Sequence, residues 1–539
     1  MTMPAVREVL DVHHALGRLD GTAALAVNGE VVATWAAGQA RPGVDLTTET
    51  RLPIGSLTKA VTAAGVLALV ADGKLALDAP IGDYLPAGLV AWADTVTVRH
   101  CLAHTAGIPS LFKAHPGIPP ATTAQVTSTI PVEDLVAHFA GLPLRFAAGS
   151  AFEYSNSGYV LLALAIEHAS GEPFHRFLSR AIFEPIGVPR IGVVEVDALE
   201  VLPRFGAHAA PVLHPSWQLG AGDLAASAPD LARLHARLSS VLPADALALM
   251  TQPSTPSYGF GWRLGTRAGH RVAWHEGVLP GMVATIHRAL DADVVAVVMT
   301  PRVPSAAHTT FVRSWLNRVA DQLVAIGRGS SPIDAPEVPR PFTRRELGEL
   351  PGRYEVDTGR ALVIEAVGDQ LHARAEGPWL IQGVLADLEP EEQRVAHAGT
   401  LACHALRDRA WDRLHALCSS VVRSIETPRS LANAWEPTLS HLGALEEATL
   451  VLVSGPVACL RVRFQSGAVL DLRVSTDEDG RSVAGLYVVA VGDLPAVCAQ
   501  TIRAAGDRFY SDGFTGGVPD AWLEINQRTR TAVVRRKHC

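Results

Sequence analysis

Residues 52–70 read LPIGSLTKAVTAAGVLALV, and they hold the most informative pair of side chains in the chain. The run from Lys59 onward is rich in alanine and leucine, which predicts a helix with an apolar face. Ser56 would then lie at a helix N-terminus, where free backbone N–H groups and the helix dipole favour a developing anion. Lys59 follows one turn later on the same face. We predict Ser56 as a nucleophile with Lys59 as its partner; the alternative for Ser56 is an ordinary helix N-cap.

A second serine–lysine pair with the same spacing, Ser110 and Lys113, has a different context. Prolines flank it on both sides, so we predict a loop there. Lysine is also scarce, because only four of the 46 basic residues are lysines, and this scarcity favours a specific role for Lys59.

Tyr154-Ser155-Asn156 is the second informative segment. A serine hydroxyl is a poor nucleophile until a base takes its proton. A buried lysine near other cations can lose its charge, and a tyrosine held beside cations can become a phenolate. Tyr154 is therefore the candidate general base, and the Asn156 amide can orient a substrate carbonyl or the lysine head. The alternative is that Tyr154 is a packed aromatic side chain in an ordinary turn.

His275-Glu276-Gly277 is the third segment, and its context resembles the start of a strand pair. Gly277 would let the backbone come close to a ligand. A strand beside the nucleophile can add a second oxyanion donor. A structural histidine at a strand end is the alternative for His275. The same His-x-Gly pattern recurs at His115, His397 and His441.

Four segments, one of which surrounds Tyr154, follow a recognisable order along the first 325 or so residues. They are LAHTAGIP (102–109), FEYSNSGY (152–159), GAGDL (220–224) and YGFGW (258–262). Together with the three segments above, they resemble the serine β-lactamase and penicillin-binding-protein family. The resemblance is to the branch that contains class C β-lactamases, D-aminopeptidases and related esterases.

This resemblance implies a role for each candidate residue. Ser56 would be the nucleophile, Lys59 its partner and Tyr154 the base. Asn156 would orient the substrate, Gly277 and Val278 would contact it, and His275 would stand where many penicillin-binding proteins have lysine. The backbone N–H groups of Ser56 and Val278 would form the oxyanion hole. Three positions depart from the family pattern, namely Ala106, Ala148 and Asp223. Of these, Asp223 puts the substrate range in doubt.

We expect an α+β catalytic domain over residues 1–328, with a mixed antiparallel sheet and a helical subdomain as in β-lactamases. A hairpin with an Asn28-Gly29 turn opens it. A proline-rich linker is expected over 329–342. Short alternating strands then predict one or two small antiparallel β-barrels, over 343–415 and 416–539.

Composition limits the class of protein. The chain has 539 residues, is 48% hydrophobic and 19% charged, and has a net charge of −8, which argues against non-specific nucleic-acid binding. We predict no membrane span, no secretory signal and no cofactor. The six cysteines lie far apart without a Cys-x-x-Cys pair, so we expect free thiols and a cytoplasmic location.

The layout of domains is similar to that of D-stereospecific aminopeptidases. The first hypothesis is therefore a serine hydrolase that cleaves an amide or ester bond through an acyl-enzyme and releases an N-terminal D-amino acid. An acyltransferase, a peptide cyclase, an esterase and a non-catalytic ligand-binding protein stay open as alternatives. The partner would be a small molecule or short peptide, and self-association into a homo-oligomer stays open. Loops 475–481 and 511–517 are candidates to hold a substrate ammonium group, or are solvated hairpin tips.

Overall fold

The computed structural model divides the chain into two compact units. The first comprises Met1–His14, Leu19–Pro304 and Arg313–Pro336, and the second comprises Ala15–Arg18, Ser305–Val312 and Glu337–Cys539. The structure describes residues 2–15, 18–112, 123–205, 208–255, 257–303, 309–332, 339–340, 343–357, 360–368, 370–376, 390–419, 422–423, 427–454, 457–466, 469–476, 481–489, 500–505, 508–510, 521–526 and 531–536.

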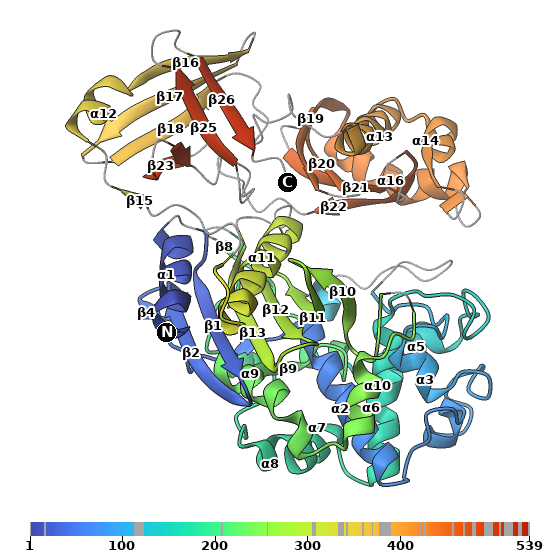
Figure 1. Ribbon diagram of the computed structural model, residues 1–539. Helices are drawn as coiled ribbons and strands as arrows, with labels where there is room; N and C mark the ends of the chain where they lie inside the picture. The colour runs from blue at the N-terminus through green and yellow to red at the C-terminus, as the bar shows by residue number, and fades with distance from the viewer. Residues whose placement is uncertain are drawn as a thin grey trace. The chain divides into compact units, whose positions relative to one another are not determined.

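A six-stranded antiparallel sheet forms the centre of the first unit (Figure 1). Its order is β10-β11-β12-β13-β1-β2, so β1 (Gly21–Val27) from the start of the unit pairs with β13 (Val294–Thr300) from its end. Every residue of β13 is buried, as expected for an apolar strand covered on both faces. The other strands are β2 (Glu30–Ala37), β10 (Arg263–Arg267), β11 (His270–Leu279) and β12 (Met282–Ala289).

Helices cover both faces of this sheet. Side chains alternate along β1, so Ala24 and Leu25 point to opposite faces. Helix α9 (Ala228–Ala236) packs on β1 and β13 from one side. Helices α1 (Thr2–Ala15) and α11 (Thr309–Gly327) lie together on the other, joined by a 3.0 Å hydrogen bond between His13 and Gln322.

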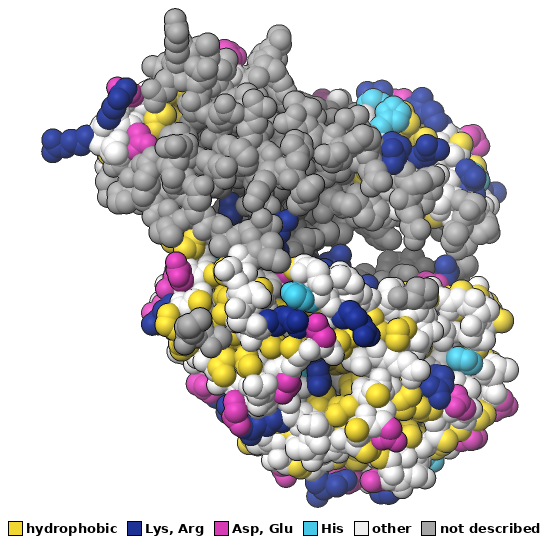
Figure 2. Space-filling model, viewed as in Figure 1, with side chains coloured by type: hydrophobic (Ala, Val, Ile, Leu, Met, Phe, Trp, Pro, Cys, Tyr) yellow, Lys and Arg dark blue, Asp and Glu magenta, His cyan; other side chains and the backbone are white. Residues whose placement is uncertain are grey.

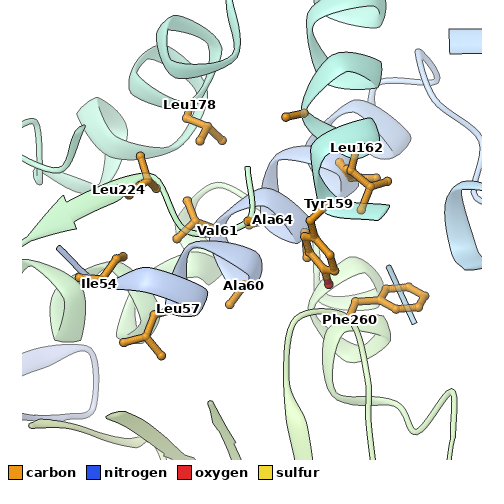
Figure 3. Close-up of a cluster of buried hydrophobic side chains, with 14 of the residues drawn as sticks. Ile54, Leu57, Ala60, Val61, Ala64, Tyr159, Leu162, Leu178, Leu224 and Phe260 are labelled. Atoms are coloured by element: carbon orange, nitrogen blue, oxygen red, sulfur yellow. The ribbon is translucent and has the colours of Figure 1, made fainter. Parts of the chain in front are cut away.

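A helical subdomain is built around α2 (Thr58–Ala71), most of which is buried. It packs against α6 (Asn156–Ser170), and a Cβ atom added at Gly65 would lie 3.2 Å from Ile166 of α6, so the two helices cross closely. Figure 3 shows Leu57, Ala60 and Val61 in the same apolar cluster as Tyr159 and Leu224. The other helices are α3 (Val98–Leu102), α4 (Thr123–Val126), α5 (Val132–Ala140), α7 (Phe174–Leu178), α8 (Glu184–Ile186) and α10 (Ala244–Thr251).

Short elements complete the first unit. Helical turns occur at Gly55–Leu57 (η1), Ile81–Tyr84, Ser179–Phe183, Val196–Ala198, Pro215–Gln218 and Leu238–Ser240. Short strands are β3 (Gln39–Arg41), β4 (Val44–Asp45), β5 (Leu52–Pro53), β6 (Gly192–Val193), β7 (Arg204–Phe205), β8 (His208–Ala209), β9 (Leu224–Ala226) and β14 (Arg302–Val303).

The expected α+β fold, with an antiparallel sheet and a helical subdomain, is confirmed. The predicted Asn-Gly hairpin joins β1 to β2, and both turn residues have positive φ, at 51° for Asn28 and 79° for Gly29. Among cysteines whose side chains the structure describes, Cys101, Cys403 and Cys418 are buried and form no disulfide. None of the helices in the described ranges combines the length and apolar character needed to cross a membrane. On the face of the first unit visible in Figure 2, acidic and basic side chains are interspersed.

The second unit contains two separate sheets. The larger has the order β15-β23-β18-β17-β16-β26-β25-β24, with a further pairing of β23 with β24. The smaller is the antiparallel meander β19-β20-β21-β22, which packs on helix α13. The strands are β15 (Pro339–Arg340), β16 (Gly352–Asp357), β17 (Arg360–Val367), β18 (Gln370–Glu376), β19 (Leu445–Ser454), β20 (Val457–Phe464), β21 (Val469–Thr476), β22 (Val483–Val489), β23 (Gln500–Ala505), β24 (Arg508–Tyr510), β25 (Ala521–Asn526) and β26 (Thr531–Arg536). The helices are α12 (Arg344–Glu349), α13 (Pro390–Arg407), α14 (Trp411–Leu417) and α16 (Pro428–Leu442).

This arrangement differs from two small barrels in succession over 343–415 and 416–539. Strand β18 pairs with β23, which joins residues 371–373 to 500–502, so residues 390–489 interrupt one sheet. The meander β19–β22 carries a core shared with helices, and small closed barrels are not confirmed in the described residues. Local alternation predicts a strand but not its distant partner, which is why the sequence suggested consecutive domains.

Candidate active site

Ser56 lies in the helical turn η1, directly before helix α2. Its side chain is half-buried, whereas Lys59 is fully buried one turn further on. Lys59 Nζ donates a hydrogen bond of 3.0 Å to Ser56 Oγ and another of 2.7 Å to the carbonyl oxygen of Ala221. The serine and lysine predicted to act together are therefore in direct contact.

The segment before and into β9 fixes the first turns of α2. Thr62 Oγ1 donates a 2.7 Å hydrogen bond to the carbonyl oxygen of Gly220, and Thr58 Oγ1 accepts one of 3.3 Å from the Leu224 N–H. With the bond from Lys59 to Ala221, three residues of α2 hold the same short segment. The lysine head is thus held in place by the backbone carbonyl of Ala221, in a segment fixed by Thr58 and Thr62.

Burial has a large effect on the lysine. Loss of hydration lowers the pKa of Lys59 well below its ordinary value, and the charge of Asp223 opposes this by raising the pKa. The Lys59 Nζ atom also lies 5.0 Å from the centroid of the Tyr154 ring and 5.5 Å from that of Tyr159. Surroundings of this kind favour a neutral amine, which can accept a proton.

Tyr154 is held beside both residues of the pair. Burial raises the pKa of Tyr154, while its hydrogen bond with Ser56 and the charge of Arg263 act in the opposite direction. Its ring centroid lies 4.3 Å from that of His104 and 6.0 Å from that of His275. The Ser56 hydroxyl therefore contacts Lys59 directly, and Tyr154 lies near enough to Ser56 for their interaction to lower the Tyr154 pKa.

A buried chain of hydrogen bonds runs behind Tyr154, through His104, Tyr258 and His275. The Ser155 N–H donates to His104 Nδ1 over 3.2 Å, so the neutral ring carries its proton on Nε2, which lies 3.2 Å from Tyr258 Oη. Tyr258 Oη then lies 3.1 Å from His275 Nε2, and His275 Nδ1 lies 2.9 Å from the Glu276 carbonyl oxygen. A carbonyl only accepts, so His275 Nδ1 carries the proton and Nε2 accepts from Tyr258.

Burial keeps both histidines of this chain neutral. Desolvation lowers the pKa of His104 and of His275, and Lys59 acts in the same direction on each when it carries an ammonium charge. His275 is only 2% exposed. The structure thus brings His275 to the site, but both of its ring nitrogens already have partners inside the protein.

Strand β11 meets η1 at two glycines. A Cβ atom added at Gly277 would lie 1.9 Å from the Ile54 carbonyl oxygen, and one added at Gly55 would lie 3.3 Å from the Val278 nitrogen. Gly55 also has a φ of +51°. Strand β10 pairs with β11 only as far as Trp274, so residues 275–279 lie beyond that pairing. The Val278 backbone therefore lies against that of Gly55, the residue directly before Ser56.

Glu276 anchors the far side of β11. Its carboxylate accepts hydrogen bonds of 3.1 Å from Arg263 Nε and 2.9 Å from Asn317 Nδ2. The Oδ1 atom of Asn317 in turn accepts from Thr285 Oγ1 at 2.5 Å and lies 3.1 Å from His287 Nε2. These contacts tie β10, β11, β12 and α11 together beside the site.

We expect Glu276 to make the fold more stable at neutral pH than in acid. Burial opposes its ionisation, but attraction to Arg263 and the Asn317 hydrogen bond prevail and lower the pKa of Glu276. The stability it contributes is present above its ordinary pKa of 4.5 and is lost as the pH falls through the lowered value. Glu276→Gln should therefore cost about 1.5–3 kcal/mol at pH 7, and less towards pH 3.

Denaturant titrations of both proteins between pH 7 and pH 3 measure this effect. Glu172→Gln is the matched control, because Glu172 also binds an arginine, Arg180, but at the surface. A Glu276→Gln penalty that stays constant with pH would contradict the assignment.

The structure brings Ser56, Lys59, Tyr154, His275 and the backbone of Gly277 and Val278 together. Asn156 opens α6 two residues after Tyr154, with a half-buried side chain.

The sequence analysis quoted His104 and Tyr258 within motifs but gave them no role, and it did not connect Asp223 with His175. The only sign in the sequence of this hydrogen-bonded pair was that a histidine and a tyrosine each occur within a motif. Of the two candidate loops in the second unit, 477–480 and 511–517 lie outside the described residues.

Comparisons with known proteins identify the family and the fold of the first unit. The Beta-lactamase family model matches residues 6–314, more than half of the chain. The putative penicillin-binding protein PbpX of Bacillus subtilis is 28% identical over 277 residues, which cover 48% of this chain and 65% of PbpX, just under two thirds of that relative. Penicillin-binding protein 4 of Amycolatopsis lactamdurans is 26% identical over 351 residues, covering 59% of this chain and 87% of that protein. A D-amino acid amidase from Ochrobactrum anthropi SV3, solved with D-phenylalanine, superposes with a TM-score of 0.52 at 22% identity, covering 61% of this chain and 99% of the amidase.

A serine hydrolase is the class of protein that this fold and these relatives define. Because the family match spans more than half of the sequence, the chain belongs to the Beta-lactamase family, alongside the penicillin-binding proteins.

Proposed function

We propose that the chain hydrolyses an amide or ester bond through an acyl-enzyme on Ser56, and that it releases an N-terminal D-amino acid. The observation that supports this most directly is the 3.0 Å contact between Lys59 Nζ and Ser56 Oγ at the start of α2. Membership of the family supports acyl transfer to serine. The D-amino acid amidase from Ochrobactrum anthropi has the same fold and suggests which substrate to test first.

In the proposed mechanism, Lys59 as a neutral amine accepts the Ser56 proton while Oγ bonds to the substrate carbonyl carbon. We expected Tyr154 as the base, but burial raises the pKa of Tyr154 and lowers that of Lys59, which favours the phenol and the amine. The backbone N–H groups of Ser56 and Val278 stabilise the oxyanion. Tyr154 then gives its proton to the leaving nitrogen as the C–N bond breaks.

Deacylation reverses these roles with water. Lys59 first returns its extra proton to Tyr154. Water then attacks the acyl carbon and gives a proton to Lys59; Ser56 regains it as the acid leaves. In this scheme Asn156 orients the substrate carbonyl. His275 positions β11 through its bonds to Tyr258 and Glu276 rather than contacting the substrate.

The test is incubation of the purified protein with matched D- and L-amino acid amides and short peptide thioesters, followed by mass spectrometry. We expect free D-amino acid, with at least about tenfold preference over the L-enantiomer, because a pocket that binds several substituents discriminates by differential contacts. Equal release from both enantiomers would reject the D-specific assignment. Cyclic or transferred product in place of free acid would instead identify an acyltransferase or peptide cyclase, the second candidate.

A further inference from the structure

Asp223 is buried in the segment that contacts Lys59, at a position where the family resemblance implies glycine. Its side chain is 1% exposed, and its Oδ2 atom lies 2.6 Å from Nε2 of His175 on helix α7. Its Oδ1 atom accepts a 3.1 Å hydrogen bond from the Gly220 N–H. The His175 side chain is 35% exposed, so protons from solvent can reach it.

This carboxylate belongs to the same short segment that holds the lysine head. Residues 220–224 supply the carbonyl oxygen of Ala221 to Lys59 Nζ and that of Gly220 to Thr62 Oγ1. The charge of Asp223 favours the ammonium form of Lys59 and thereby raises its pKa against the effect of burial. Asp223 is therefore coupled to Lys59 both through the backbone and through charge.

We propose that Asp223 and His175 form a positioning dyad that sets the protonation of Lys59 and lets solvent pH reach the active site through His175. With His175 neutral, the Asp223 charge is uncompensated and favours Lys59 as an ammonium group. When His175 takes up a proton, its charge balances Asp223 and the amine form of Lys59 is favoured. As a result, Lys59 remains a neutral amine down to a lower pH than it would if Asp223 had no histidine partner.

The other groups that face Lys59 do not replace this control. Tyr154 and Tyr159 present their rings to Nζ, and His104 and His275 feel its charge but are kept neutral by burial. The ring of Phe174 lies 5.1 Å from that of His175 and is apolar. Asp223 is the one acidic group acting on Lys59 among the described residues, and His175 is its ionisable partner.

Titration of Lys59 itself tests the proposal without requiring turnover. Only four lysines occur in the chain, so a 13C label on the lysine ε-carbon gives a spectrum in which Lys59 can be assigned by comparison with Lys59→Arg. Asp223→Asn keeps an oxygen for the Gly220 N–H and an amide N–H for neutral His175. We expect it to lower the Lys59 titration midpoint by about one pH unit.

His175→Gln tests the solvent-exposed member of the dyad, because glutamine can donate a hydrogen bond to Asp223 but cannot carry a positive charge. We expect it to raise the Lys59 midpoint, and to have no effect when Asp223→Asn is already present. Asp230→Asn is the matched control, since Asp230 is also buried but pairs with Arg233 on α9. It should leave the Lys59 midpoint unchanged.

The inference rests on the proposed role of Lys59, and the two can fail separately. The acidic limb of the pH profile of kcat/KM should follow the NMR midpoint in each variant. A Lys59 midpoint that stays in place in both Asp223→Asn and His175→Gln would show a merely structural pair and overturn the dyad, whatever the activity. A midpoint that moves while the acidic limb stays in place would support the dyad and reject Lys59 as the base.

Discussion

Replacing Ser56 by alanine is expected to abolish turnover, with kcat falling by about 10⁴-fold or more. The hydroxyl is the one atom in this site that both contacts Lys59 Nζ, at 3.0 Å, and lies at the start of α2. Without it no acyl-enzyme forms, and the remaining oxyanion donors give only residual catalysis. Steady-state kinetics on the substrate found active, with intact-mass spectrometry for the acyl adduct, measure both consequences.

The chain offers its own control for Ser56. Ser110 stands in the second serine–lysine pair, and its side chain is buried away from solvent. Ser110→Ala should keep the acyl adduct and lower kcat little, apart from any loss of folded protein. Turnover that survives in Ser56→Ala would show that Ser56 is not the nucleophile. An adduct that disappears in Ser110→Ala instead would contradict the assignment in the same way.

Local sequence patterns account for most of the first unit and for half of the site. The spacing of Ser56 and Lys59 predicts their contact, because residues three apart on one helix share a face. The order of strands and helices likewise predicts the α+β fold. Local sequence patterns do not show which way a side chain points once segments that are distant in the sequence pack together. His104 and Tyr258 are 154 positions apart, and their hydrogen bond depends on how two loops pack.

Charge pairs at long range are hidden for the same reason. Asp223 is recognisable as a departure from a glycine pattern and lies directly before β9, but its partner His175 lies 48 positions earlier, on helix α7. In the second unit, alternation predicts β18 and says nothing of its pairing with β23. Patterns of period two or 3.6 report one element at a time, whereas partners are chosen by the whole fold.

Gly277→Ala is expected to produce the second large loss, about 10²-fold or more in kcat/KM, although no reacting atom is removed. The added Cβ would stand 1.9 Å from the Ile54 carbonyl oxygen. Because both groups are fixed to the backbone, the clash can be relieved only if the two backbone segments move apart. Strand β11 would then draw away from η1 and carry the Val278 N–H away from Gly55 and from the proposed oxyanion hole. A displacement of about 1 Å at reacting groups costs on this order.

Gly141→Ala separates this effect from a general cost of replacing glycine, because Gly141 has φ of −85° and open space where the Cβ would go. We expect wild-type kinetics for it, and for Gly277→Ala a stability loss of about 1–3 kcal/mol from overpacking. The rate of Ser56 acylation by a small ester that makes few contacts distinguishes the two possible reasons for low activity. If β11 supplies an oxyanion donor, acylation should be slower even though the protein remains folded. Ser56 and Lys59 would still be paired at the start of α2, but the developing negative charge would lack one of its N–H donors. A Gly277→Ala protein that acylates and turns over at the wild-type rate would mean that β11 tolerates the shift and that Val278 does not take part in the oxyanion hole.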